Sequence, residues 1–348
     1  MLAPISFLFG IVIFIRNKCF DINILKSTSF KLPIISIGNL SVGGNGKTPH
    51  TEYLIRLLNQ NTTTLSRGYK RKTKGYVLAS ETSTSFDIGD EPLQLYQKFK
   101  DIAVAVCENR VEGVNKILKS KPNTKTILLD DAFQHRAIKP GFSILVTDFN
   151  NLFINDYLMP SGRLREWRCG YKRADVIIVS KTPQNTPKNT LTKISNEIRP
   201  TKNQSLYFST IKYSKLTPFN QPEQAKINTD LTQTDVLLFT GIANPTPLYS
   251  YIKKTYQSVN YLKFSDHHNF NKTDIEKIKN CYNKINSNNK IIITTEKDIM
   301  RLSLPEILES IQDLPIYYIP IEIDFISNDD KVSFDKQILD YVNSNTRN

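Results

Sequence analysis

The 348-residue sequence has few of the residues that build disulfide frameworks or metal clusters. It contains four histidines and four cysteines, and the cysteines are scattered singly at Cys19, Cys107, Cys169 and Cys281. Disulfide frameworks need paired cysteines, and structural zinc sites need Cys or His residues at short spacings. The sequence therefore indicates neither, and we expect a reducing, cytoplasmic setting.

The N-terminus falls short of the roughly 20 apolar residues that a helix needs to cross a bilayer. Its apolar run extends from Leu2 to Ile15 and is followed, not preceded, by the basic residues Arg16 and Lys18. A signal peptide has the opposite order, and no small-residue cleavage site is evident. We expect residues 1–25 to form a helix that lies in a membrane interface, with its cationic edge on anionic headgroups. The alternative is a helix that packs on the protein's own core.

Acidic residues are in the minority, with 33 Asp and Glu against 46 Lys and Arg and a formal net charge of +13. A basic surface suits nucleic acid, anionic lipid or a phosphorylated substrate, and a generally Lys-rich composition is an equal explanation. The sequence has no nucleic-acid recognition motif and no interleaving of aromatic and basic residues. We therefore expect no nucleic-acid partner.

Residues 41–50 read SVGGNGKTPH and follow a short apolar stretch at 32–40. The pattern is close to the phosphate-binding loop G-x-x-x-x-G-K-[ST], with Ser41 in place of the first glycine. The glycines let backbone N–H groups turn toward an anion, Lys47 would reach the β- and γ-phosphates, and the Thr48 hydroxyl would ligate Mg²⁺. The predicted nucleotide-binding residues are Ser41, Val42, Gly43, Gly44, Asn45, Gly46, Lys47 and Thr48.

The nucleotide is predicted to be ATP, with a base that is either adenine or weakly discriminated. Guanine-binding relatives of such loops carry N-K-x-D or T-K-x-D after a later strand. The corresponding stretch here is SKTP, in which Pro183 replaces the aspartate.

A second acidic anchor for magnesium is expected after the apolar stretch TILLDD, which ends in Asp130 and Asp131. One carboxylate can hold the metal or its water while the other faces the reacting centre. The alternative is a helix cap followed by a surface acid.

Apolar stretches alternate with helical patterns along the chain, which predicts a parallel sheet covered on both faces. The fold class is α/β, a P-loop NTPase-type sheet flanked by helices in residues 26–215, followed by a smaller α/β lobe in residues 216–348. The predicted strands are 32–40, 62–68, 102–107, 126–131, 142–148, 175–182 and 314–325. Short strands are predicted around 205–213, and 235–245 and 290–298 are each predicted to be a strand followed by a loop. Helices are predicted at 48–60, 91–99, 110–120, 245–256 and 271–285, and residues 184–230 are predicted to form a polar connecting region.

Eight stretches in order resemble the tetraacyldisaccharide 4'-kinase family, the lipid A 4'-kinases of Gram-negative bacteria. They are IGNLSVGGNGKTPH, LSRGYKRK, IGDEPLQL, LLDDAFQHR, MPSGRLRE, GIANP, FSDHHNF and TTEKD. The family's loop commonly has Thr or Ser where Ser41 stands. The resemblance implies Mg²⁺- and ATP-dependent phosphorylation of the 4'-hydroxyl of a tetraacyldisaccharide 1-phosphate, giving lipid IVA. It also implies a peripheral protein on the cytoplasmic face of the inner membrane, which we expect to be a monomer.

The resemblance also implies roles for particular residues. Asp90 would act as the base that accepts the hydroxyl proton, with His267 as its partner, while Lys47 and Asp131 complete the catalytic set. The implied metal ligands are Thr48, Asp130, Asp131 and Glu166, and the implied substrate-binding residues are Glu91, Arg67, Arg71 and Arg165.

Several alternatives stay open at this point. Asp90 can instead cap a helix that starts at Pro92, His268 is the neighbouring rival of His267, and the role of Lys297 is undecided. A different function class, a membrane-associated regulatory P-loop ATPase, is the alternative to a kinase.

Overall fold

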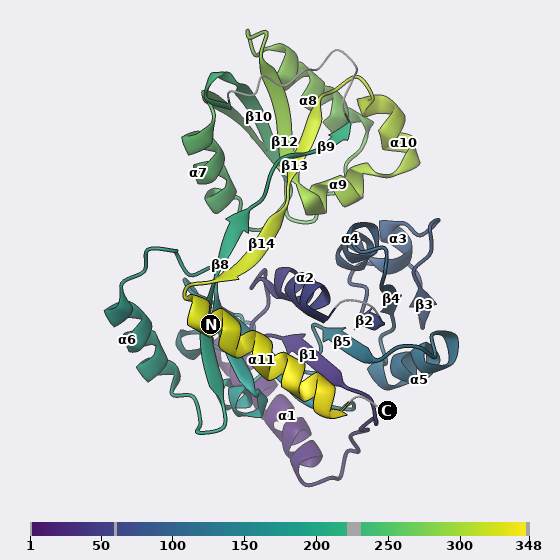
Figure 1. Cartoon of the computed structure of the whole chain (residues 1–348), viewed down its shortest axis with the longest axis vertical. Coiled ribbons are helices and arrows are strands. Elements are labelled where there is room, and N and C mark those ends of the chain that lie inside the picture. Colours follow the sequence, from purple (N-terminus) through teal and green to yellow (C-terminus); the bar gives the residue numbers. More distant parts are fainter. Residues whose placement is uncertain (1, 59–60, 221–230, 346–348) are drawn as a thin grey trace. The chain divides into compact units, whose positions relative to one another are not determined.

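The computed structural model describes residues 2–58, 61–220 and 231–345 of the chain (Figure 1). The chain divides into two compact units. The larger unit contains Met1–Lys212 and Glu322–Asn348, and the smaller unit contains Tyr213–Ile321.

The larger unit is built on a nine-stranded sheet in the order β14-β8-β7-β6-β1-β5-β2-β4-β3. The central strand β1 pairs in parallel with β5 and β6, whereas the short β3 pairs antiparallel with β4. The predicted α/β class with a parallel sheet is therefore confirmed. The strands are β1 (Ile34–Gly38), β2 (Thr62–Ser66), β3 (Val77–Leu78), β4 (Ala103–Val106), β5 (Thr126–Asp130), β6 (Phe142–Asp148), β7 (Val176–Ser180), β8 (Ser205–Tyr213) and β14 (Ile321–Phe325).

Helices cover both faces of this sheet, because every residue of β1 is apolar or small and buried. On one face, Leu54 and Ile55 of α2 (Lys47–Leu58) pack in a cluster with Ile35 and Ile37. The other face is covered by α5 (Arg110–Ser120) and α6 (Lys188–Ile198), and the latter helix was not predicted. Burying each such aliphatic side chain contributes roughly 1.5–3 kcal/mol.

The predicted strand at 314–325 is in fact two strands in two different sheets. Pro320 separates β13 (Ile316–Ile319) from β14, and a proline lacks the N–H that a continuous ladder needs. β13 belongs to the sheet of the smaller unit, whereas β14 lies beside β8 at the edge of the nine-stranded sheet.

The predicted C-terminal lobe at 216–348 is likewise corrected, because the chain returns to the larger unit after Ile321. Helix α11 (Asn328–Asn345) buries Phe334 and Ile338 in the same cluster as α2. Its Tyr341 hydroxyl donates a hydrogen bond to the Ile34 carbonyl at 3.2 Å. The terminal helix therefore supports the strand that leads into the glycine loop.

The smaller unit has a five-stranded sheet in the order β11-β10-β12-β13-β9, in which only β9 is antiparallel to its neighbour. Its strands are β9 (Thr217–Asn220), β10 (Asp235–Thr240), β11 (Ser258–Lys263), β12 (Lys290–Thr295) and β13. Its helices are α7 (Thr246–Thr255), α8 (Lys272–Asn283), α9 (Glu296–Leu302) and α10 (Pro305–Leu308). Part of the predicted connecting region, residues 221–230, lies outside the described residues.

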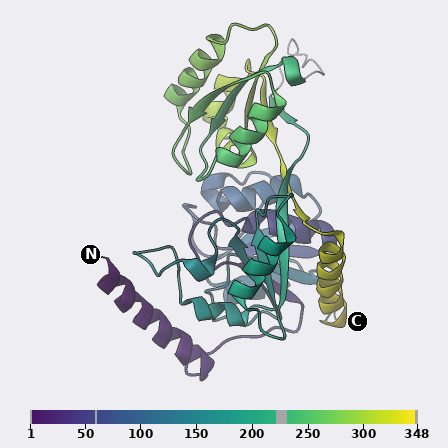
Figure 2. The same ribbon diagram turned by 90° about the vertical axis from the view of Figure 1, so that its left-hand side faces the viewer.

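Helix α1 (Ala3–Asp21) continues beyond the predicted apolar run and, by length and composition alone, could cross a membrane. Figure 2 shows it along the outside of the larger unit. Gly10 faces the unit, where a Cβ would lie 2.6 Å from Leu158 and 2.7 Å from Trp167, so a larger residue would force one of these side chains to move. The large apolar side chains point outward and are exposed, among them Ile5, Phe7, Leu8, Val12 and Ile15. One side of the helix therefore packs on its own unit, as the alternative interpretation expected, and the membrane-interface interpretation stays a prediction.

Candidate functional site

The glycine loop lies at the carboxyl end of β1, between this central strand and α2. Gly43 and Gly46 have φ angles of +112° and +86°, which residues with a Cβ rarely adopt. A Cβ at Gly43 or Gly44 would meet no atom within 4 Å, so the loop is open on that side. Ligands of open α/β sheets bind at such a strand end.

The first half of the loop pairs with the GRLRE segment. The Val42 N–H donates to the Arg163 carbonyl at 2.8 Å, and the Arg165 N–H donates to the Leu40 carbonyl at 2.7 Å. Ser41 and Leu164 form an isolated antiparallel bridge between these two bonds. The position of Ser41 therefore requires an extended residue, which explains why serine is accepted there.

The second half of the loop is braced by the end of β7. The Ser180 hydroxyl donates to the Asn45 carbonyl at 2.7 Å. Lys181 donates to the Gly44 carbonyl and forms an ion pair of 2.7 Å with Asp148. The SKTP stretch, which lacks the guanine-binding motif, thus supports the phosphate loop directly.

His50 is a buried support for the loop that sequence reasoning missed. Its Nδ1 lies 2.7 Å from the Gly46 carbonyl and its Nε2 lies 2.9 Å from the Ser209 hydroxyl. Burial lowers the pKa of His50 to about 4, against the opposing effect of the Gly46 hydrogen bond. The imidazole is therefore neutral at pH 7, donating from Nδ1 and accepting from Ser209 at Nε2.

The neutral state of His50 makes the stability of the protein pH-dependent. In the unfolded chain His50 binds a proton below about pH 6.5, whereas in the folded protein it does so only near pH 4. The contribution of His50 to the free energy of unfolding is therefore complete above pH 6.5 and is lost as the pH falls toward 4. Between pH 7 and pH 5 we expect the wild type to lose about 2 kcal/mol more unfolding free energy than His50→Gln. Urea unfolding of both proteins at the two pH values measures this difference, and equal losses would contradict the assignment.

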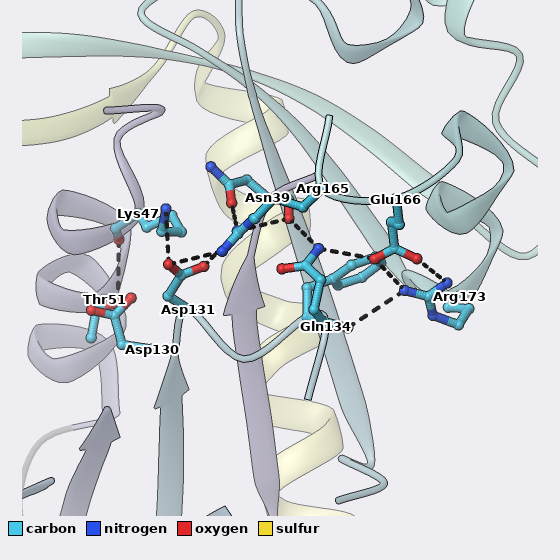
Figure 3. A network of polar contacts seen from close by, with 10 residues as sticks. Asn39, Lys47, Thr51, Asp130, Asp131, Gln134, Arg165, Glu166 and Arg173 are labelled. Atoms are coloured by element: carbon cyan, nitrogen blue, oxygen red, sulfur yellow. Dashed lines mark hydrogen bonds and ion pairs between the residues drawn. The ribbon is translucent and has the colours of Figure 1, made fainter. Parts of the chain in front are cut away.

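Lys47, Asp131 and Arg165 form a charged network at the loop (Figure 3). Lys47 Nζ lies 3.6 Å from Asp131 Oδ2, and the two terminal nitrogens of Arg165 lie 2.7 and 3.2 Å from the carboxylate oxygens. Burial raises the pKa of Asp131, but Lys47 and Arg165 outweigh it and bring the pKa to about 2. The carboxylate is ionised at neutral pH, and it holds two cations where a phosphate chain would lie.

Asp130 lies against the first turn of α2. It is buried, and its Oδ1 accepts a hydrogen bond of 3.4 Å from the Thr51 hydroxyl (Figure 3). Thr48, which is also buried, belongs to the same turn. Mg²⁺ is commonly held by one or two carboxylates together with substrate phosphates and water, so these side chains fit a magnesium–nucleotide complex. Within the described residues, no group of three or more His, Cys, Asp or Glu side chains could hold a metal by itself.

Glu166 has surroundings that oppose its predicted metal role. Its Oε1 accepts from Gln134 at 2.9 Å and from Arg173 at 2.9 Å. Its Oε2 lies 2.8 Å from a second Arg173 nitrogen and accepts from Asn17 of α1 at 3.1 Å. A buried carboxylate with four donors has the contacts of a structural ion pair, and this one joins α1 to the segment beside the loop.

Arg71 is also placed differently from its predicted substrate role. The side chain is 2% exposed, and Nη2 donates to the Gly75 carbonyl and to Glu108, both at 2.6 Å. It therefore braces its own loop. Arg67 is exposed and stays a candidate for substrate binding.

A cationic patch around His135 was not foreseen. Burial lowers the pKa of His135 to about 4, and Arg110, Arg16 and Arg67 lower it further by charge repulsion. Arg110 is buried at the start of α5, and burial lowers its pKa to about 10 against the opposing charges of Asp131 and Asp130. Three guanidinium groups thus lie within electrostatic reach of one imidazole, next to the acidic pair.

Asp90 is the first residue of α4 (Asp90–Lys98), and Glu91 follows it in the first turn. The residue at the helix cap is Gly89, with φ +91°, so the alternative of Asp90 as the cap of a helix beginning at Pro92 is wrong. α4 is tied to α2 by the buried Glu52, which accepts from Lys98 and Gln94, both at 2.7 Å.

His267 lies in the smaller unit, within a cluster made by three of the quoted motifs. Arg301 lies 3.2 Å from His267 Nδ1 and donates to the Gly241 carbonyl at 2.9 Å. Asp298, from TTEKD, accepts from Arg301 at 3.0 Å and from the Gly241 N–H at 3.1 Å. Burial raises the pKa of Asp298, opposed by the Arg301 charge and these hydrogen bonds.

His268 has a different environment from its neighbour. Its Nε2 lies 2.8 Å from Asp274 in the first turn of α8, and its ring packs against Phe264 and Phe270. These contacts stabilise the start of α8, which makes His268 the weaker candidate for chemistry.

A parallel sheet whose central strand runs into a Gly-Lys-Thr loop, with ionised acid beside the lysine, defines a phosphate-loop nucleotide-binding protein. The family model described as LpxK, tetraacyldisaccharide-1-P 4'-kinase, matches residues 1–343. The chain belongs to this kinase family, as the eight stretches predicted, and the alternative of a regulatory ATPase loses its support.

Relatives and a solved structure agree with this membership. The tetraacyldisaccharide 4'-kinase of Bacteroides thetaiotaomicron is 45% identical over 358 residues, covering 100% of this chain and 94% of that protein. That of Flavobacterium psychrophilum is 44% identical, covering 100% and 98%. The crystal structure of "apo" form LpxK from Aquifex aeolicus in complex with ATP is 26% identical, with a TM-score of 0.72 and 98% of each chain covered.

Proposed function

We propose that this kinase takes its phosphoryl group from ATP bound at residues 41–48 and transfers it in line to the 4'-hydroxyl of a tetraacyldisaccharide 1-phosphate. The observation that carries the proposal is the Lys47–Asp131–Arg165 network at the mouth of the open glycine loop. Its two cations are placed to stabilise charge on the phosphoryl group in the transition state. The related structure from Aquifex aeolicus, solved in complex with ATP, supports the choice of nucleotide.

Thr48, Asp130 and Asp131 would hold the magnesium ion that accompanies ATP. When bound, the ion would supply positive charge that offsets the charge developing on the transferred phosphoryl group. Asp131 stays ionised through its contacts with Lys47 and Arg165, and Asp130 is buried beside the turn that carries Thr48.

Asp90 is proposed as the base, and His267 is proposed as a second participant in the proton transfer. A hydroxyl nucleophile needs an acceptor for its proton in the transition state, and a carboxylate at the first turn of a helix provides one. The Glu52 contacts fix α4, and with it Asp90, relative to the phosphate-loop helix. Glu91 is kept as a substrate-binding candidate.

Arg67 is proposed to bind the anionic group of the substrate. It is exposed, and its positive charge, with those of Arg16 and Arg110, lowers the pKa of His135. The three arginines therefore form a cationic patch suited to phosphate. Arg165 is proposed to contact a phosphate, with Asp131 lying between it and Lys47.

We place the protein, as a monomer, on the cytoplasmic face of the inner membrane through α1, with the substrate's acyl chains remaining in the bilayer. The outward apolar side chains of α1 and its basic residues Arg16 and Lys18 support this placement.

The test of function is incubation of the purified full-length protein with labelled ATP and a lipid disaccharide 1-phosphate acceptor. Label at the 4'-oxygen of the sugar supports the proposal, and ATP hydrolysis without a phosphorylated lipid contradicts it.

The membrane placement makes a separate prediction. Phe7 and Leu8 are 60% and 63% exposed, so Phe7→Ser/Leu8→Ser is expected to weaken binding to anionic lipid vesicles about tenfold or more without unfolding the protein. Vesicle sedimentation measures the affinity. Val332→Ser on α11, at a position 58% exposed, is the matched control and should bind like the wild type. An equal effect of both variants would argue against α1 as the membrane contact.

A further inference from the structure

The hydrogen bond between Arg301 and His267 determines where the imidazole carries its proton. Arg301 Nη2 lies 3.2 Å from His267 Nδ1. A guanidinium group has only donors, so Nδ1 must accept. A neutral imidazole whose Nδ1 accepts carries its proton on Nε2.

The guanidinium of Arg301 is itself fixed and cannot turn away from the ring. Its side chain is 2% exposed, and Nη1 donates to the Gly241 carbonyl at 2.9 Å and to Asp298 at 3.0 Å. Asp298 is fully buried and is held in turn by the Thr295 hydroxyl at 2.7 Å. The orientation of the arginine therefore follows from the fold of the smaller unit.

The backbone of His267 is fixed by the same cluster. Its φ is +56°, in the left-handed region that is costly for a residue with a Cβ. The His267 N–H donates to the Gly241 carbonyl at 3.0 Å, the same oxygen that accepts from Arg301. A Cβ at Gly241 would lie 3.0 Å from Asp298 and 3.2 Å from His268, so glycine allows this close approach.

We propose that Arg301 is a positioning residue that holds neutral His267 in the tautomer with its proton on Nε2. This inference rests on the proposed function, in which His267 takes part in the proton transfer. An Nε2–H group donates a hydrogen bond to a carboxylate, whereas the other tautomer would present a lone pair to it. Arg301 thus makes the imidazole a donor at its outer nitrogen.

The experiment combines imidazole nitrogen NMR with kinetics on the full-length protein. With ¹⁵N-labelled histidine, the His267 resonances are assigned by their loss in His267→Gln. The wild type is expected to show the Nε2–H pattern. Arg301→Met should give a mixture of tautomers and lower kcat at least about tenfold with an unchanged KM for ATP. Arg301→Lys, which keeps a donor, should restore the tautomer and kcat to within about threefold.

Arg301→Met leaves the buried Asp298 without its cation, so Arg301→Met/Asp298→Asn is made alongside it to keep the fold. An Nδ1–H pattern in the wild type would overturn the proposal. A changed tautomer with unchanged kcat would overturn the positioning role. A wild type that phosphorylates no lipid acceptor would count against the proposed function, and the NMR result would still decide the tautomer.

Discussion

Replacing Asp90 with alanine is expected to abolish phosphoryl transfer while ATP binding stays near that of the wild type. Asp90 lies in the first turn of α4, outside the 41–48 loop, so its loss removes the proton acceptor and leaves the phosphate contacts in place. Positioned bases contribute about 10²–10⁴-fold to such rates. Transfer is measured with labelled ATP and lipid acceptor, and binding is measured by calorimetry.

Asp101→Ala is the matched control for the loss of one carboxylate. Asp101 is an exposed residue shortly after α4, and its replacement should leave kcat unchanged. Transfer by Asp90→Ala at more than about a tenth of the wild-type rate would show that another group takes the proton.

Lys47→Ala is expected to lower kcat/KM about 10³-fold, with a loss in kcat as well as in ATP affinity. Lys47 is the loop cation, and charge that it stabilises on the moving phosphoryl group is absent from the ground state. The fold should persist, because Asp131 keeps its bidentate contact with Arg165. Steady-state kinetics with ATP as the varied substrate separate the two effects.

Lys193→Ala controls for the loss of a positive charge, since Lys193 is 76% exposed on α6. It should leave kcat/KM unchanged. A Lys47→Ala variant that loses ATP affinity but keeps the wild-type kcat would assign the lysine to binding alone.

The sequence predicted the strand, the glycine loop and the helix that follows it, because these features depend on neighbouring residues. Buried strand residues, glycine and helical spacing are all local patterns. The supports of the loop depend on distant partners and were missed. His50 contacts Ser209, 159 positions away, and no local pattern distinguishes a buried histidine in a helix from an exposed one.

The C-terminal region shows the same limit. The apolar stretch at 314–325 reads as one strand, yet Pro320 divides it between two sheets. The return of α11 to the larger unit depends on where Phe334 and Ile338 find apolar partners, which are set by α2 and β1 far earlier in the chain.

Sequence reasoning placed a residue best where the chemistry requires one residue type. It did worst for charged residues that form ion pairs inside the protein. Lys47 and Asp131 lie together as the loop pattern required. Arg71 and Glu166 were expected at the substrate or metal, but each is buried against an oppositely charged partner in the protein. The sequence shows a charge but not whether another part of the chain neutralises it.

The contacts of Glu166 link the proposed membrane helix to the segment beside the phosphate loop. Glu166 holds Asn17 of α1, and the adjacent residue, Arg165, holds Asp131 beside the phosphate loop. The residue that contacts the proposed membrane helix, Glu166, and the residue that contacts the nucleotide site, Arg165, are therefore joined by one peptide bond. With α1 at the bilayer surface, this short connection would fix the height of the nucleotide site above the headgroups.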